Sequence, residues 1–144
     1  MLRQVLLGGG VSAVNIVIHA VAMVAIIHGG RRLLAYGQAW PVAYVVKAMF
    51  ATVVTVAILT LAHFAEIVVW SLAYAAIDVA PPGTDLLYFA FVNYTTLGYG
   101  DVVPAERWRL IGPITALNGV MMIGWSTAVI FEVMRIAVHG KQGN

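Results

Sequence analysis

The sequence predicts an all-α integral membrane protein, and three observations lead to this fold class. The chain has 144 residues, of which 62% are hydrophobic and only 10% charged, whereas a soluble domain carries about 25% charged residues. Its apolar residues form three long runs separated by polar connections. A short polar stretch rich in glycine, "NYTTLGYGD" at 93–101, lies between the second and third runs. Lipid rather than water is therefore expected to surround most of the surface.

The charge and cysteine content narrow the classes of partner. The formal net charge of +2 rests on few ionisable groups, so a nucleic-acid partner is not indicated. The chain contains no cysteine, which excludes disulfides and thiol chemistry. No constellation of residues typical of an enzyme is visible, and no cofactor is expected.

Residues 1–30 are predicted to form an additional N-terminal transmembrane helix. The apolar run from Val5 to Ile27 is longer than the roughly 7–15 residues of a signal-peptide core, and no small-x-small cleavage site follows it. Asn15 and His19 make the run only moderately apolar. Part of this helix is therefore expected to face protein.

One outer helix is predicted over residues 42–78. A run this long could form one helix or two, but it contains neither glycine nor proline to mark a hairpin. The connection at 31–41 carries Arg31 and Arg32 and is predicted to be cytoplasmic.

Positive charge also fixes the expected orientation. Arg135 and Lys141 follow the third apolar run, so the short tail at 139–144 is also predicted to be cytoplasmic. Three spans then place the N-terminus outside. The expected location is the cell membrane, which is the inner membrane if the source is Gram-negative.

A re-entrant half-helix is predicted over residues 84–95, and an inner helix over 109–138. Thr84 is the expected N-cap, with Asp85 in the first turn. About 12 residues give a helix of about 18 Å, too short to cross a hydrocarbon layer of about 30 Å. The non-helical stretch that follows is tolerated at that depth only where protein buries it or where it lines a water-filled path.

This stretch resembles the selectivity filter of the potassium channels in the pore-loop cation channel superfamily. The matching residues are Thr95-Thr96-Leu97-Gly98-Tyr99-Gly100-Asp101, and the resemblance covers roughly 42–138. "LAHFAEIVVW" (61–70) and "NGVMMIGWSTAVIF" (118–131) resemble a small bacterial branch with one extra helix before the two-helix pore unit. Domain 42–138 is accordingly expected to be a pore domain, with its filter at 96–100.

The resemblance implies that backbone carbonyls of Thr96, Leu97, Gly98 and Tyr99, with the Thr96 hydroxyl, form the K⁺ sites. Gly98 and Gly100 are needed because alternate residues must adopt unusual backbone angles, which glycine reaches without steric cost. One chain supplies one strand of such a filter, so a homotetramer is implied. The expected partners are K⁺ as the permeant ion, membrane lipid and further copies of the chain.

Four residues are predicted to support the filter: Thr95, Asp101, Tyr88 and Phe89. Many relatives carry paired tryptophans where this chain has Tyr88 and Phe89. Tyr88 can still donate a hydrogen bond to Asp101, whereas Phe89 has no polar atom with which to hold the hydroxyl of Tyr99. The degree of selectivity therefore remains open between potassium-selective and weakly selective cation conduction.

Glu66 is the most unusual polar residue of the apolar runs. Along one helix it lies about 28 Å from Lys47 and about 18 Å from Asp78, so it falls within the hydrocarbon layer or at its outer margin. His63, at i−3, shares its face. The pair is predicted either to sense protons or to brace the pore through a buried hydrogen bond, and the second alternative is favoured.

Asn118 and Gly119 occupy the middle of the inner helix. Gly119 can act as a hinge or allow close helix packing, and Asn118 can face the cavity or bond across helices; the sequence leaves both choices open.

Two other functions are alternatives to a channel. One is a non-conducting subunit with a pore-loop fold. The other is a metal-binding or redox protein using His19, His28, His63 and Glu66, for which no ligand spacing fits.

Overall fold

The computed structural model describes residues 1–35 and 41–139, and all regular secondary structure in these residues is helical. Its elements are α1 (Leu2–Ala35), α2 (Pro41–Ala76), α3 (Leu86–Tyr94), the 3₁₀ turn η1 (Glu106–Trp108) and α4 (Ile111–His139). The three long helices are apolar and long enough to cross a membrane, over Leu2–Leu33, Tyr44–Ala76 and Glu106–Ala137. The predicted all-α fold with three spans and one short helix is confirmed.

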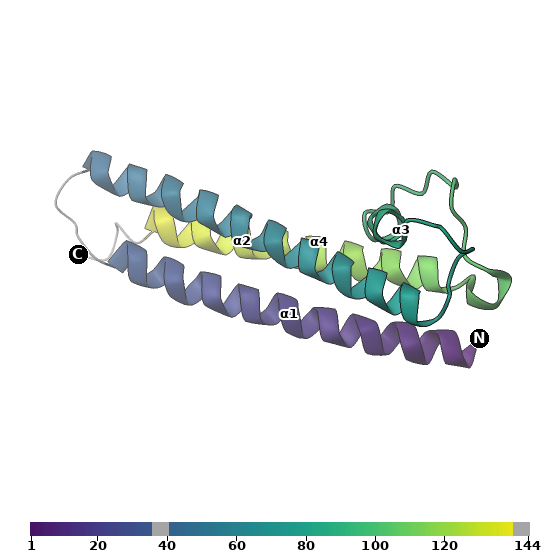
Figure 1. Cartoon of the computed structure of the whole chain (residues 1–144). Helices are drawn as coiled ribbons and strands as arrows, with labels where there is room; N and C mark the ends of the chain where they lie inside the picture. The colour runs from purple at the N-terminus through teal and green to yellow at the C-terminus, as the bar shows by residue number, and fades with distance from the viewer. Residues whose placement is uncertain (36–40, 140–144) are drawn as a thin grey trace.

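The three long helices pack against one another, and α3 packs against α2 and α4. Figure 1 shows α3 and the loop after it at the end of the bundle where the N-terminus lies. The C-terminal end of α4 lies at the opposite end, near the end of α1 and the start of α2. The bundle therefore carries its pore-loop elements at one end only.

Helix α1 is longer than predicted. It continues through Gly29 and Gly30 to Ala35, so Arg31 and Arg32 belong to the helix rather than to a connection that begins at residue 31. Glycine inside a helix costs about 1 kcal/mol relative to alanine, and the packing of α1 on α2 and α4 offsets this cost. Arg32 lies in the last turn of α1, where a cation favours the helix dipole. Residues 36–40 of the predicted connection and 140–144 of the predicted tail lie outside the described residues.

Helix α2 is one uninterrupted helix, as the lack of glycine and proline predicted. Its threonine hydroxyls do not need partners in the membrane, because each donates to a carbonyl one turn earlier. The bonds run from Thr52 to Ala48 at 3.0 Å, from Thr55 to Ala51 at 2.8 Å and from Thr60 to Val56 at 2.8 Å. The helix therefore satisfies these polar groups internally.

Helix α3 begins two residues later than predicted and ends one residue earlier. Its N-cap is Asp85, whose carboxylate accepts the backbone N–H of Tyr88 at 3.0 Å. The hydroxyl of Thr84 instead donates to the carbonyl of Pro81 at 2.8 Å. Both residues are good caps, and the carboxylate, as a charged acceptor, binds the helix N-terminus more strongly.

An aromatic core fixes α3 at this end of the bundle. Trp70 and Tyr74 of α2 are fully buried, and the ring of Tyr74 lies 5.2 Å from that of Phe89 on α3. The N-terminus of α1 is attached to the same region. Arg3 stacks over the ring of Trp108 at 5.1 Å, and the side chain of Gln4 accepts the backbone N–H of Leu110 at 2.8 Å.

Candidate functional site: the pore loop and its buried support

The stretch after α3 is anchored to the helix by its own N–H groups. The backbone N–H of Thr96 donates to Asn93 at 3.1 Å, and that of Leu97 donates to Val92 at 2.9 Å. Gly98 also donates to Val92, at 3.4 Å. These bonds occupy orphan carbonyls at the end of α3, so the donors of the loop point back toward the protein.

Positive φ angles alternate along this stretch. Thr96 has φ 60°, Gly98 has φ 58° and Gly100 has φ 78°. The two glycines reach these angles at no steric cost, as the sequence argument requires. Thr96 does so at a cost of about 1–2 kcal/mol, because its Cβ crowds the backbone. Backbone strain of this kind is concentrated at functional sites.

The loop is open to its surroundings in the single chain. Every residue from Thr95 to Asp101 is exposed, and 70% of Tyr99 is accessible. Among residues 1–35 and 41–139, no hydrogen bond is made to the carbonyl oxygens of Thr96, Leu97, Gly98 or Tyr99. Unpaired carbonyls are not tolerated in lipid. They need water, ions or neighbouring chains.

The outer end of the loop is tied to α3 by one side-chain pair. The hydroxyl of Tyr88 donates to the carboxylate of Asp101 at 2.6 Å, as predicted. This hydrogen bond raises the pKa of Tyr88, because the ionised phenol could not donate to the carboxylate. The other oxygen of Asp101 accepts the N–H of Val102 at 3.0 Å. Phe89 is buried against Tyr74 and offers Tyr99 no hydrogen bond, also as predicted.

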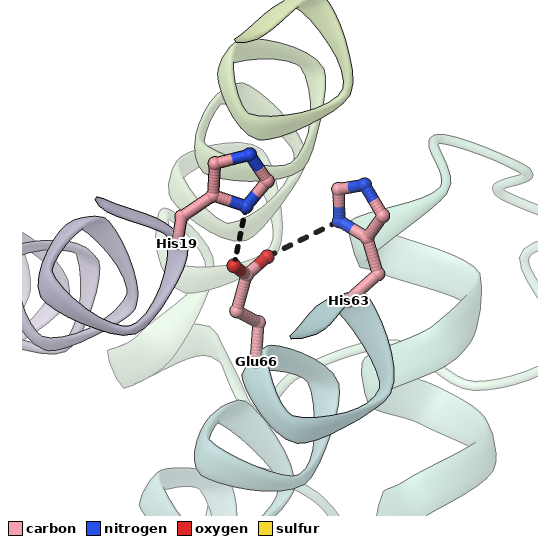
Figure 2. A group of neighbouring side chains, drawn as sticks. All are labelled: His19, His63 and Glu66. Carbon is pink, nitrogen blue, oxygen red and sulfur yellow. Dashed lines mark hydrogen bonds and ion pairs between the residues drawn. The ribbon is translucent and has the colours of Figure 1, made fainter. Parts of the chain in front are cut away.

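Behind the loop, Glu66 collects three side-chain partners. Its carboxylate is fully buried and bonds His63 at 3.2 Å, which confirms the predicted i,i+3 pair. His19 of α1 bonds the other carboxylate oxygen at 2.8 Å. Tyr94 is the last residue of α3, and its hydroxyl donates to the carboxylate oxygen that also bonds His63. Figure 2 shows both imidazoles turned toward Glu66 from different helices.

Ser126 of α4 contacts both histidines at their other ring nitrogens. Its hydroxyl lies 2.9 Å from Nε2 of His63 and 3.4 Å from Nε2 of His19. The cluster formed by His19, His63, Glu66, Tyr94 and Ser126 therefore joins all four α-helices. We call it the Glu66 cluster.

Asn118 bonds across helices and is buried, which settles one of the choices the sequence left open. Its side-chain oxygen accepts the amide of Asn15 on α1 at 2.9 Å and the indole N–H of Trp70 on α2 at 2.9 Å. Asn15 also donates to the backbone carbonyl of Glu66 at 3.3 Å. This second polar group lies next to the Glu66 cluster.

Gly119 packs directly against the end of α3. A Cβ at this position would lie 2.0 Å from the backbone oxygen of Tyr94. By contrast, a Cβ at Gly124 would meet nothing within 4 Å. Close packing is therefore an observed property of Gly119, whereas a hinge role stays a prediction.

Tyr94 and Ser126 are members of the cluster that the sequence did not predict, and His19 was grouped with His63 and Glu66 only in the metal-binding alternative. His28, which was considered with His19, is exposed and bonds its own helix at the carbonyl of Val24. A usable signal was present in α1, because Asn15 and His19 are four residues apart and so share one face of a helix. Nothing in the sequence showed which face of α2 this one would meet.

Comparison with known proteins agrees with this geometry. A family model described as "Ion channel" matches residues 57–136, more than half of the chain, and covers most of α2, the pore loop and nearly all of α4. A Rhodopseudomonas palustris protein named "Putative potassium channel protein" is 31% identical over 58 residues. That match spans 40% of this chain and only 14% of the relative. No solved structure matches the chain significantly.

Proposed function

Because this chain belongs to the ion channel family, we propose that its pore loop is a filter that conducts K⁺ passively across the membrane. Thr96, Leu97, Gly98 and Tyr99 would supply the carbonyl ligands, with Gly100 completing the loop. Carbonyl oxygens replace the water shell of K⁺ without adding a charge that would trap the ion. The relative in Rhodopseudomonas palustris is named "Putative potassium channel protein", although the match covers only 14% of it; the name agrees with this proposal.

The alternating backbone carries the proposal. Positive φ at Thr96, Gly98 and Gly100 breaks the two-sided alternation of an extended strand, in which successive carbonyls point to opposite sides. The N–H groups of Thr96, Leu97 and Gly98 are meanwhile held by α3. This combination leaves a row of unpaired acceptors, and no donor from the described chain competes with a cation for them.

A homotetramer follows from the exposure of the same loop. One chain supplies only one side of a coordination shell, and four copies around an axis would enclose the ion. The exposed Tyr99 and Leu97 would then face neighbouring chains or the ion path. Lipid, K⁺ and three further copies of the chain are the partners that this arrangement requires.

We place the pore loop and the N-terminus outside and the C-terminus in the cytoplasm. Arg31 and Arg32 at the end of α1, Lys47 near the start of α2 and Arg135 near the end of α4 all belong to the opposite end of the bundle. Positive residues near span ends favour the cytoplasmic side.

Ion flux in liposomes tests the proposal. Purified protein should pass K⁺ much faster than Na⁺, and Gly98→Ala should abolish the flux while the oligomer still assembles, because a side chain at φ 58° is strained. Gly10→Ala on α1 is the matched control, since its Cβ would meet nothing within 4 Å and its φ is not positive. Undiminished K⁺ flux in Gly98→Ala would overturn the assignment.

Two other outcomes would identify the rival functions. Comparable K⁺, Na⁺ and Cs⁺ fluxes would indicate a weakly selective cation channel. Phe89, which has no polar atom to offer the hydroxyl of Tyr99, is the residue that favours it. No flux of any of these ions from a correctly assembled oligomer would indicate a non-conducting subunit.

A further inference from the structure

The strongest unexplained feature is the Glu66 cluster, which lies outside the proposed ion path. Three of its side chains are of the types that bind divalent transition metals. His19, His63 and Glu66 offer ligand atoms that all lie within 4.8 Å of one another. We propose that the cluster binds one divalent transition-metal ion of the zinc type, held by the Nδ1 atoms of His19 and His63, the carboxylate of Glu66 and the phenol oxygen of Tyr94.

The donor atoms converge from three helices on one point. Nδ1 of His19 lies 2.8 Å from one carboxylate oxygen of Glu66, and Nδ1 of His63 lies 3.2 Å from the other. The hydroxyl of Tyr94 lies 2.9 Å from that same Nδ1 of His63 and bonds Glu66. Ligands at 2.0–2.2 Å from a tetrahedral zinc ion are about 3.3 Å apart. The separations of 2.8, 3.2 and 2.9 Å are each within about 0.5 Å of this value. The hydroxyl of Tyr94 would have to move away from Glu66 for both to bind the ion.

Ser126 lies close to both imidazoles on the side away from Glu66. Its hydroxyl lies 2.9 Å from Nε2 of His63 and 3.4 Å from Nε2 of His19. The Nδ1 atoms of both rings lie against the carboxylate, so each ring has one nitrogen toward Glu66 and the other toward Ser126.

This arrangement fits a metal bound at the two Nδ1 atoms. Each imidazole would then carry its proton on Nε2, and the two lone pairs of the Ser126 oxygen would accept both N–H groups. Histidines that bind metals commonly donate their second N–H to such a partner, which fixes the ring orientation. The position of Ser126 between His19 and His63 is therefore the second observation that points to a metal.

Charge balance points the same way. Glu66 is fully buried, and its two carboxylate oxygens lie against the Nδ1 atoms of His19 and His63. A buried carboxylate in a membrane needs a neutralising partner. A divalent cation bound between these groups would supply the positive charge.

A route to the cluster is present beside His63. A pocket of about 200 Å³ is lined by His63 and Tyr94 together with neighbouring residues of α2, the pore loop and α4. His63 is the one ligand with a partly exposed side chain, at 20%. The bound ion would clamp α1 to the end of α3 next to the filter, whichever ion the pore selects.

Metal content of the intact protein tests this inference. Protein purified in detergent with a tag that lacks histidine is equilibrated with Zn²⁺, freed of excess metal, and measured by elemental analysis. We expect one Zn²⁺ per chain in the natural sequence. We expect binding at least about 100-fold weaker in His19→Ala and unchanged binding in His28→Ala, an exposed histidine outside the cluster.

Two further measurements guard against misfolded variants and adventitious binding. Ser126→Ala keeps all four ligands and should weaken binding by about 10–100-fold. Bound Co²⁺ should give the visible absorption of a tetrahedral site in the natural protein and lose it in His19→Ala. If the folded natural protein retains no metal, or if His19→Ala retains as much, the inference is wrong. Neither result bears on ion flux, so it stands or falls separately from the proposed channel function.

Discussion

The backbone oxygen of Tyr94 lies directly against Gly119, so that a methyl group on the glycine would be 2.0 Å away. Tyr94 ends α3 and the proposed filter begins two residues later. Helix α4 therefore positions the end of α3 by contact with backbone, which no side-chain rearrangement can relieve.

Gly119→Ala should accordingly lower the thermal stability of the oligomer and abolish ion flux together. Overpacking a tight contact costs about 1–3 kcal/mol. We expect a cost of about 3 kcal/mol, because the atom in contact is the backbone oxygen of Tyr94 and cannot rotate away as a side chain could. Gly124→Ala is the control on the same helix, because its Cβ would meet nothing within 4 Å. Thermal unfolding in detergent and liposome flux are measured for both. Altered flux with unchanged stability would instead identify Gly119 as a hinge.

Tyr94→Phe should destabilise the protein by about 1–3 kcal/mol, because it removes a hydroxyl that bonds both Glu66 and His63 in a buried site. Tyr44→Phe is the matched control. It removes one bond, of 2.5 Å, to the carbonyl of Ala137 at the other end of the bundle. Thermal unfolding should show a clearly larger loss for Tyr94→Phe. Equal losses would mean that the bonds to Glu66 do not support α3.

Tyr88→Phe should leave stability nearly unchanged and reduce discrimination between K⁺ and Na⁺. The pair of Tyr88 with Asp101 is exposed, so its loss is expected to act on the order of the outer loop more than on unfolding. Bi-ionic reversal potentials in planar bilayers measure the effect. Unchanged selectivity would show that the outer loop does not depend on this bond.

The same pair predicts a pH dependence with a definite sign. The bond to Asp101 raises the pKa of Tyr88 above its ordinary value of 10.0. Its contribution is therefore fully present below about pH 10, the value in the unfolded chain, and is lost as pH rises through the raised value. Alkaline absorbance titrations of the natural protein and of Tyr88→Phe should differ by one tyrosine, and that tyrosine should ionise at a higher pH than an ordinary tyrosine. If the tyrosine that is absent from Tyr88→Phe ionises at or below the ordinary pKa of tyrosine, this prediction is wrong.

Local signals predicted the helices and the positive φ angles after α3 well, because each rests on nearby residues. The absence of glycine and proline made α2 one helix, and the glycines at 98 and 100 marked the positive φ angles. Helix ends were less predictable. Thr84 and Asp85 are adjacent and both good caps, so the sequence left the first residue of α3 uncertain; the structure has Asp85 as the N-cap.

The polar interior was predictable only in part, for a geometric reason. His63 and Glu66 lie on one helix at i,i+3, so their contact follows from local periodicity. His19 is 47 residues from Glu66 in sequence, and its contact depends on how α1 rotates against α2. That rotation is set by packing along the whole interface, which hydrophobic periodicity does not resolve when all faces are apolar.

Asn118→Leu gives a final test of how α1 is held on the pore unit. The substitution keeps the size of the side chain and removes the oxygen that accepts from both Asn15 and Trp70. Two buried donors would then lose their acceptor, at a cost of about 1–3 kcal/mol each. Asn15 retains its bond of 3.3 Å to the carbonyl of Glu66, so the loss at Asn15 should cost about 1 kcal/mol, the lower end of this range. We expect a lower unfolding temperature and faster proteolysis of α1, with Leu117→Asn, at an exposed position of the same helix, as the converse control. Unchanged stability in Asn118→Leu would show that apolar packing alone holds α1 in place.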